Sequence, residues 1–352
     1  MGLINYDHKS VRRITLWFCL VLVVSLMVKI LTPSSYDVPE IQKTPNLVYW
    51  ELATGSKIAY LHLEGEGDSS KSPIIYLHGG PGGLIRDEVV QSLKPLTALG
   101  HDLYFYDQIG SGHSGRLENI TEYSVERHQK DLEAILEHIH APHVILMGHS
   151  WGCLLAINFL QNHPKTTRIE KLILEVPGPI LPVNTSLSSL QPTDGFKHIQ
   201  PGYSNKDANA ETKSLRTSLV KFVATRFGFK LGSDNEMDQY FTYWSQALNK
   251  STACLPRQSS AYPGGGGYYA HIMTVRSFDH VLDKREVLKK IQIPTLVIRA
   301  QCDNQPWGYM HEYLDLLPNS ECAFIEKSGH DLATTNTKQY QEALYHFLTN
   351  VN

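Results

Sequence analysis

The amino-acid sequence predicts an α/β fold, in which a mostly parallel, doubly wound sheet has a helical cap inserted after its sixth strand. Three observations lead to this prediction. Short apolar, β-branched runs alternate with longer helical patterns along much of the chain, as in chains that build parallel sheets. One such run, at 144–147, leads through a Gly-His-Ser-Trp-Gly turn into a helical stretch at 154–160. The alternation then stops between residues 179 and 287, where Ser, Asn, Tyr and Gly become frequent.

The expected elements follow one another from residue 47 onwards. Strands are expected at 47–52, 58–63, 74–77, 103–106, 144–147, 169–174, 295–300 and 323–325. The first two form a hairpin, and a helix at about 125–138 presents an apolar face along one side. Helical patterns inside the cap fall at about 215–227 and 238–247. Because sites in such sheets lie at the C-terminal ends of the strands, residues at those ends are the first functional candidates.

Length and composition suit one large globular unit with an insertion. The chain has 352 residues, of which 42% are hydrophobic and 19% charged, enough for a substantial core. Six segments are expected, namely a basic N-terminus (1–13), an apolar helix (14–31), a linker (32–45), the first part of the core (46–178), the cap (179–287) and the second part of the core (288–352). With a net charge of −3 and no dense basic patch, nothing indicates a nucleic-acid partner.

The N-terminus has the pattern of a signal anchor that binds the membrane. Lys9, Arg12 and Arg13 precede an apolar run, and residues 14–31 are just long enough to span a bilayer if Lys29 reaches back to the interface. Basic residues ahead of the span predict a cytoplasmic N-terminus and a globular part on the non-cytoplasmic side. The alternatives are a peripheral helix, or a cleaved signal peptide and hence a secreted or periplasmic protein, although no small-x-small cleavage site is visible.

Residues 148–152 form a G-x-S-x-G motif between an apolar strand pattern and a helical stretch. In this context the motif exposes a nucleophilic serine on a sharp turn. Such a turn is strained, and Gly148 and Gly152 suit positions where strand and helix approach too closely for a side chain. Ser150 is therefore the candidate nucleophile, and an ordinary strand-to-helix turn is the alternative.

Two residues further along complete a catalytic triad in the order Ser, Asp, His. Asp303 follows the strand at 295–300, and His330 lies in a loop before the last helical pattern. A carboxylate at a strand end can hold an imidazole in the correct tautomer and stabilise its protonated form. Asp107, at the end of another strand, is the reserve acid, although it suits the ordering of its own turn better.

A glycine-rich stretch at 78–83 reads His-Gly-Gly-Pro-Gly-Gly and follows the strand at 74–77 directly. Acyl transfer requires backbone N–H groups aimed at the oxyanion that develops. The amides of Gly80 and of Trp151, the residue after the candidate nucleophile, are assigned to this oxyanion hole. A flexible turn is the alternative, and a phosphate cradle is disfavoured because neither a P-loop ending nor G-x-G-x-x-G spacing is present.

From about residue 44 to its C-terminus the chain resembles the proline iminopeptidase group of α/β-hydrolases, a family of serine peptidases. Four stretches carry the resemblance: His-Gly-Gly-Pro-Gly-Gly at 78–83, Asp-Gln-Ile-Gly-Ser-Gly-His-Ser at 107–114, the motif at 148–152, and Ser-Gly-His at 328–330. The resemblance implies an α/β-hydrolase fold and the same roles for the triad and the oxyanion hole. It also implies a cis peptide bond before Pro81.

The chain departs from this family at three places. Ile109 replaces the arginine of the family's Asp-Gln-Arg-Gly, and the segment before Asp303 reads Ala-Gln-Cys. The family also binds the substrate's α-ammonium group through cap glutamates, and Ser245 stands where one of them is expected. Hydrolysis is unaffected by this change, whereas aminopeptidase specificity is put in question. Trp244 and Glu175 are the candidate substrate-binding residues.

The sequence therefore predicts a cofactor-free serine hydrolase that works through an acyl-enzyme. A small peptide is the first substrate class, with release of N-terminal residues as in proline iminopeptidases. The alternatives are a membrane-anchored esterase or amidase on a small acyl substrate, and a non-catalytic binding protein with the same fold. No metal is expected, since the histidines between 138 and 143 end a helix, where they suit its carbonyls. Of the five cysteines, Cys254, Cys302 and Cys322 leave room for one bridge without indicating which pair forms it.

Overall fold

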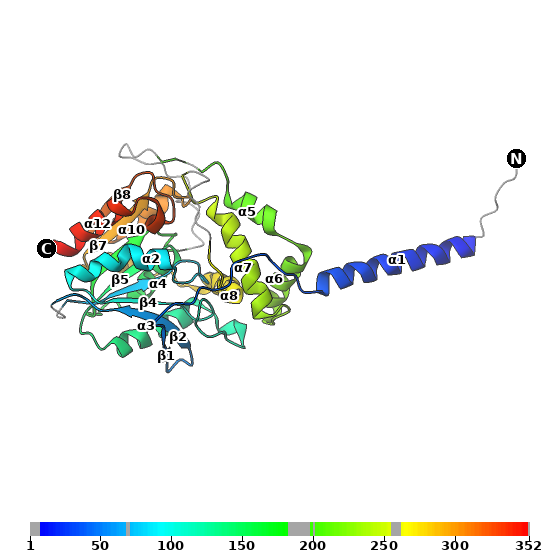
Figure 1. Ribbon diagram of the computed structural model, residues 1–352, viewed down its shortest axis with the longest axis horizontal. Coiled ribbons are helices and arrows are strands. Elements are labelled where there is room, and N and C mark those ends of the chain that lie inside the picture. The colour runs from blue at the N-terminus through cyan, green and yellow to red at the C-terminus, as the bar shows by residue number, and fades with distance from the viewer. Residues whose placement is uncertain (1–7, 68–70, 182–197, 200, 255–261, 351–352) are drawn as a thin grey trace.

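The computed structural model describes residues 8–67, 71–181, 198–199, 201–254 and 262–350. These residues form an eight-stranded sheet in the order β1-β2-β4-β3-β5-β6-β7-β8 (Figure 1). The strands are β1 (Val48–Glu51), β2 (Lys57–Leu63), β3 (Ile74–Leu77), β4 (Leu103–Tyr106), β5 (Val144–His149), β6 (Ile169–Glu175), β7 (Thr295–Ala300) and β8 (Ser320–Ile325). The pairs β1–β2 and β2–β4 are antiparallel, and all other neighbouring strands are parallel. The predicted mostly parallel sheet is confirmed.

Helices cover both faces of the sheet. Outside the cap they are α2 (Asp87–Leu93), α3 (Val125–Ile139), α4 (Trp151–Asn162), α10 (Trp307–Leu316), α11 (Leu332–Thr335) and α12 (Thr337–Thr349). Alternate side chains of β3 point to opposite faces. Ile75 and Leu77 pack in one core with residues of α3 and α4, whereas Ile74 and Tyr76 pack in a second core with residues of α2 and α12. Because both faces are covered, the C-terminal ends of the parallel strands are left at one edge as the place for a site.

The last strand is longer than the sequence pattern indicates. β8 begins at Ser320, three residues before the predicted start. Ser320, Glu321 and Cys322 pair with the first half of β7. β8 is an edge strand whose first residues are largely exposed, so its sequence need not be apolar there, and the hydrophobic pattern underestimates its length.

The described part of the segment between β6 and β7 contains helices joined by turns and loops. Its helices are α5 (Asn205–Thr212), α6 (Leu215–Phe227), α7 (Asp234–Asn249), α8 (Tyr268–Ser277) and α9 (Arg285–Leu288). α6 has the predicted bounds, whereas α7 begins four residues earlier than predicted, because the Ser233 side chain caps it by accepting the N–H of Glu236. α8 follows a glycine run and has no side-chain cap, so no start signal indicates it. Helices α6, α7 and α8 lie between the sheet and the N-terminal helix (Figure 1).

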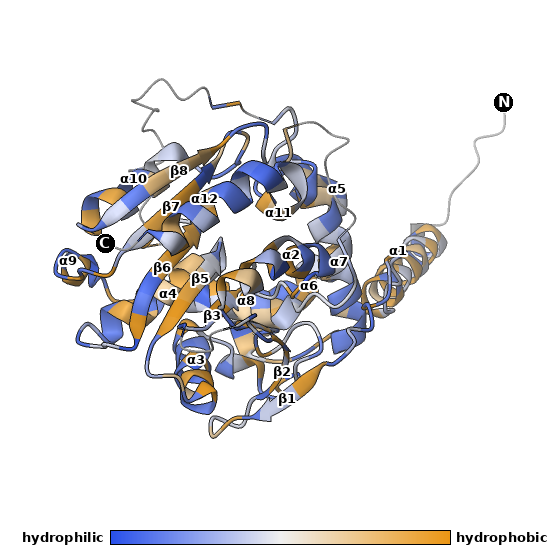
Figure 2. Ribbon diagram, turned by 60° about the vertical axis from the view of Figure 1, so that its left-hand side comes forward, coloured by the Kyte–Doolittle hydropathy of each residue, from blue (hydrophilic) through white to orange (hydrophobic). Residues whose placement is uncertain are grey.

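The N-terminal helix α1 (His8–Leu31) projects away from the body of the molecule (Figure 1). It includes the predicted apolar segment and begins six residues before it. No part of its apolar window is buried, and hydrophobic residues are exposed along much of the helix in Figure 2. A rise of 1.5 Å per residue gives its 24 residues a length of about 36 Å, and a bilayer core is about 30 Å thick. Its length and composition would therefore let α1 cross a membrane.

Candidate active site

The turn that bears Ser150 is tight and strained. Ser150 has φ 54° and ψ −112°, and the next residue, Trp151, begins α4. A Cβ added to Gly152 would lie 2.0 Å from the carbonyl oxygen of Leu77 on β3. Only glycine fits that position, as expected from the motif. A non-glycine residue at positive φ stores strain that the surrounding packing must hold, and here it directs Ser150 into a cavity.

The predicted acid and base are in direct contact. The Nδ1 atom of His330 lies 2.8 Å from Oδ1 of Asp303. The other oxygen of Asp303 accepts a hydrogen bond of 2.9 Å from Nη1 of Arg299, and both of these side chains are fully buried. Arg299 has no assigned role in the sequence prediction. Its residue type and position could have indicated the pairing. An arginine in a buried strand requires a charged partner, and Asp303 follows it by four residues.

Electrostatics keep Asp303 ionised. Burial alone raises the pKa of its carboxyl, but the Arg299 guanidinium and then His330 lower it, and the net pKa lies below the usual value. A carboxylate only accepts hydrogen bonds, so the proton between the two side chains sits on Nδ1 of His330. The lone pair of Nε2 is then available as a base, which is the tautomer that serine activation requires.

Ser150 and His330 line the same cavity, whose volume is about 330 Å³. One wall comes from the core, through the glycines of the 78–83 loop and through Arg86 and Asp331. The opposite wall comes from the cap, through residues of α5 and α7. The sequence-predicted nucleophile, base and cap are thus brought together around one space.

The glycine-rich loop approaches the serine closely. A Cβ added to Gly79 would lie 3.2 Å from the Cβ of Ser150. Gly80 lines the cavity with φ +127°, and the peptide bond between Gly80 and Pro81 is cis, as the resemblance implies. The backbone of this loop therefore lies beside the serine, where the predicted oxyanion hole requires it.

Gln108 connects the two halves of the predicted oxyanion hole. Its backbone N–H donates to Nε2 of His78 and its side-chain amide donates to the carbonyl of His78, both at 2.9 Å. Its Oε1 accepts the indole N–H of Trp151 at 2.8 Å. Burial lowers the pKa of His78 to about 4, so this imidazole is neutral and can accept. Gln108 is not among the residues predicted from the sequence, although its position just after β4, at the C-terminal edge of the sheet, could have indicated it.

Asp107 is engaged in its own turn. Its two carboxylate oxygens accept backbone N–H groups from Ile85 and His113, each at 2.8 Å. This buried residue does not line the cavity among the described residues. The arrangement agrees with a turn-ordering role, and it leaves Asp303 as the carboxylate beside His330.

The two candidate substrate-binding residues lie in different places. Trp244 lines the cavity, and its indole N–H donates to Oδ1 of Asn209 at 2.7 Å. Glu175 is buried beneath the serine turn and is not among the described residues that line the cavity. The hydroxyl of Tyr340 donates to Glu175, and Nδ1 of His149 lies 3.5 Å from it. This placement fits the support of His149 rather than contact with a substrate.

The cavity wall carries few charges. Asp331 is the one carboxylate among the described lining residues, and it pairs with Arg86 at 2.8 Å. Ser245 lines the cavity at the position where the resemblance expects a glutamate. The other polar lining groups include four asparagines, Asn205, Asn209, Asn249 and Asn304.

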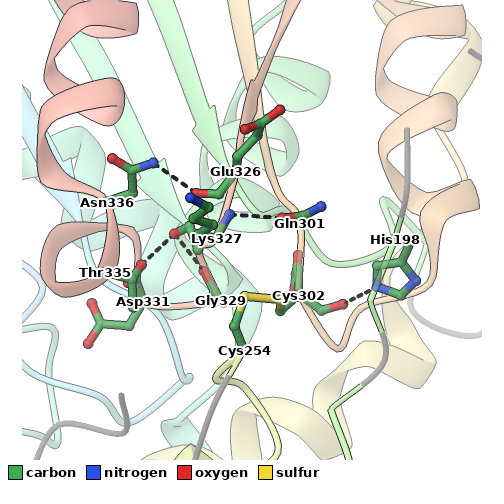
Figure 3. The surroundings of a disulfide bond; sticks show 12 residues. His198, Cys254, Gln301, Cys302, Glu326, Lys327, Gly329, Asp331, Thr335 and Asn336 are labelled. Atoms are coloured by element: carbon green, nitrogen blue, oxygen red, sulfur yellow. Dashed lines mark hydrogen bonds between the residues drawn. A yellow bond between two sulfur atoms is a disulfide. The ribbon is translucent and has the colours of Figure 1, made fainter. Parts of the chain in front are cut away.

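A disulfide joins the cap to the loop that holds Asp303 (Figure 3). Cys254 bonds to Cys302, the residue immediately before Asp303. Two residues before Cys254, the carbonyl of Thr252 accepts the backbone N–H of His330 at 2.8 Å. One cap segment is therefore tied to both loops. Cys322, the third candidate for a bridge, is free.

Comparison with known proteins agrees with this geometry. Residues 72–337 match the model of the alpha/beta hydrolase fold family, and the chain belongs to that family. It is therefore a hydrolase.

Among its relatives, a proline iminopeptidase of Heyndrickxia coagulans is 24% identical, over 85% of this chain and 97% of the relative. One of Lactobacillus helveticus is 37% identical, over 82% of this chain and 93% of the relative. Among solved structures, the proline iminopeptidase-related protein of Thermus thermophilus matches with a TM-score of 0.58 at 18% identity, over 87% of this chain and 98% of that one. An esterase of Exiguobacterium antarcticum matches with a TM-score of 0.55 at 20% identity, over 86% and 99%. At these identities the two structures establish the fold alone.

Proposed function

We propose that the protein is a serine aminopeptidase that releases N-terminal residues, proline first, from short peptides. The observation that carries the proposal is the aromatic wall of the cavity. The rings of Phe241, Trp244 and His271 lie between 5.1 and 5.4 Å from one another, in the cavity that Ser150 lines. A pyrrolidine ring packs well against such a surface. The similarity to proline iminopeptidases supports the same substrate class.

The proposed reaction uses the groups predicted from the sequence. Ser150 Oγ attacks the carbonyl carbon of the N-terminal residue while His330 takes the hydroxyl proton. Asp303 stabilises the imidazolium, and the amides of Gly80 and Trp151 donate to the oxyanion. The imidazolium then protonates the leaving amine. Water, deprotonated by the same imidazole, releases the acyl group.

A free amine in this cavity would be bound mainly by neutral acceptors. Oδ1 of Asn304 is buried and accepts no hydrogen bond in the described part of the chain, and Asn304 lines the cavity. Its amide donates to Oδ1 of Asn205 at 2.9 Å, which leaves the carbonyl end for an N–H donor. An unpaired buried acceptor is costly, so a substrate amine that donates to it would gain binding energy.

An esterase or amidase on a small neutral acyl compound is the second candidate. The observation that favours it is Ser245, which leaves the cap wall without the carboxylate that the resemblance expects. A substrate without an ammonium group avoids the cost of placing a cation beside neutral walls.

The deciding experiment compares proline and alanine arylamides, their N-acetylated forms and a short-chain aryl ester. The full chain is assayed in detergent micelles, with Ser150→Ala as the control. Arylamide cleavage that disappears on acetylation supports the aminopeptidase. Ester cleavage alone rejects it in favour of the second candidate, and turnover that survives in Ser150→Ala rejects both.

We also propose that α1 is an uncleaved signal anchor, with the hydrolase on the non-cytoplasmic side of the membrane. The basic residues before the span support this orientation. The disulfide between Cys254 and Cys302 supports an oxidising compartment. In sealed vesicles the catalytic part should be protected from protease added on the cytoplasmic side, and the purified chain should keep residues 8–31. A mature N-terminus beyond residue 31 would reject the anchor and favour a cleaved signal peptide.

A further inference from the structure

Helix α6 is apolar on its outer side as well as on its inner side. Its inner residues Val220 and Ala224 are fully buried. Four large apolar side chains, here called the α6 patch, are between 54% and 65% exposed: Leu215, Phe222, Phe227 and Phe229. The rings of Phe222 and Phe227 touch edge to face, with centroids 5.8 Å apart. Grouped exposed aromatics of this kind mark an interaction surface.

The charges of α6 are all positive. The helix contains Arg216, Lys221 and Arg226 and no carboxylate. Lys221 and Arg226 are exposed next to the patch, and the guanidinium of Arg226 lies 5.7 Å from the ring centre of Phe227. Aromatic side chains flanked by basic ones are typical of helices that lie in the interface of a bilayer, where the cations reach lipid phosphates.

The same helix holds the end of α1. Nη1 of Arg216 donates to the carbonyls of Ile30 and Leu31, the last two residues of α1, at 3.0 Å each. Arg216 also donates to Glu236 at 2.6 Å, and both side chains are only 5% exposed. Glu236 in turn accepts the backbone N–H of Ser34 at 2.9 Å. A cation at a helix C-terminus satisfies its unpaired carbonyls, so α6 and the exit of α1 are joined by a buried polar cluster.

The contacts between α6 and the end of α1 place the α6 patch close to the membrane surface if α1 spans the bilayer. A helix that spans a bilayer ends near the headgroups, and α6 contacts that end directly (Figure 1). We propose that the α6 patch inserts into the phospholipid interface of the bilayer that α1 spans, so that the cap rests on the membrane surface. The inference rests on anchoring by α1 and is independent of the substrate class.

Photo-crosslinking in the full chain tests this placement. p-Benzoylphenylalanine replaces Phe222 or Phe229 in protein reconstituted in phosphatidylcholine vesicles. Replacement of Leu22, inside α1, is the positive control for insertion. Replacement of Leu282 is the matched control, because it is 71% exposed and precedes α9, on the opposite side of the body from α1 (Figure 2). Hydrolysis of whichever arylamide or aryl ester the wild type cleaves checks the fold of each variant, since neither Phe222 nor Phe229 lines the cavity.

Lipid adducts at positions 222 and 229, several-fold above those at 282, are expected. Adducts at 22 without adducts at 222 and 229 overturn the docking of the patch while leaving the anchor in place. Absence of lipid adducts at position 22 would show that α1 is not inserted in the bilayer, and the inference would then be overturned together with the anchor. Adducts from 222 to a second protein chain overturn it in favour of self-association.

Discussion

Arg299 and Asp303 form a fully buried ion pair, with 2.9 Å between Nη1 and Oδ2, directly behind the imidazole of His330. Neither side chain reaches solvent. The guanidinium keeps the carboxylate ionised without occupying the oxygen that faces His330. The arrangement makes Arg299 a positioning residue for the proposed triad.

Replacement of Arg299 by Gln should impair stability and pH dependence together. Removal of one partner of a buried pair costs about 3–5 kcal/mol. The pKa of Asp303 should rise in the variant, since burial then acts without its main opposing charge. The acid limb of the kcat/KM profile is therefore expected to move to higher pH. Arg299→Lys, which keeps the charge, should shift the profile less. An unchanged profile in a folded Arg299→Gln protein would contradict this role.

Ser150→Ala should abolish turnover without unfolding the protein. The methyl group fits wherever the hydroxyl does, and the strained backbone is unchanged. We expect kcat to fall by at least about 10³-fold, since removal of a nucleophile leaves only residual catalysis. Labelling by a fluorophosphonate probe should also disappear. Labelling that persists at another residue would show that Ser150 is not the nucleophile.

The Arg86–Asp331 pair should make stability sensitive to acid in a narrow range. Burial opposes ionisation of Asp331, but the Arg86 guanidinium outweighs it and lowers the pKa to about 2. A depressed carboxyl pKa stabilises the folded state above the unfolded pKa of about 4, and this contribution is lost as the pH falls towards 2. The loss amounts to about 2 kcal/mol. Denaturant unfolding between pH 5 and pH 2 should show a steeper decline for the wild type than for Asp331→Asn, and parallel curves would refute the linkage.

The disulfide should support catalysis as well as stability. The bridge closes a sequence separation of 48 residues, which corresponds to about 4 kcal/mol in the chain-entropy model. Cys254→Ser combined with Cys302→Ser, or reduction of the wild type, should lower kcat more than it changes KM, because Asp303 adjoins the bridge. Cys322→Ser, at an exposed free cysteine, is the matched control. Equal activity of the oxidised and reduced enzymes would show that the disulfide contributes to stability and not to catalysis.

Ser245→Glu should increase selectivity for substrates with a free amine. A charge-assisted hydrogen bond is worth about 1.5–3 kcal/mol, or about 10- to 100-fold in kcat/KM. The gain is expected for proline arylamide and not for the aryl ester. Ser245→Gln supplies the same length without charge and serves as the control. A similar gain in both variants would show that side-chain size, not charge, is responsible.

The sequence predicts the scaffold of the site well, because that scaffold depends on local patterns. Apolar runs identify β3, β4 and β7 with the observed bounds, and the turn at Ser150 needs glycine where Gly152 meets β3. The helix α5 could also have been predicted, since Ser204 and Asp207 form a capping box at its start. α8 could not, because its start has no such signal.

By itself, the sequence determined the sheet, the order of the candidate triad residues and the apolar N-terminal helix, because periodicity and short motifs act over a few residues. Only the tertiary structure decided which partners distant residues meet. It paired Cys254 with Cys302, joined Gln108 to Trp151, buried Glu175 beneath the serine turn and brought Arg216 to the end of α1. Gln108 and Trp151 are 43 residues apart in the chain, and Arg216 and Leu31 are 185 residues apart. They depend on how whole elements pack, and no local pattern in the chain carries that information.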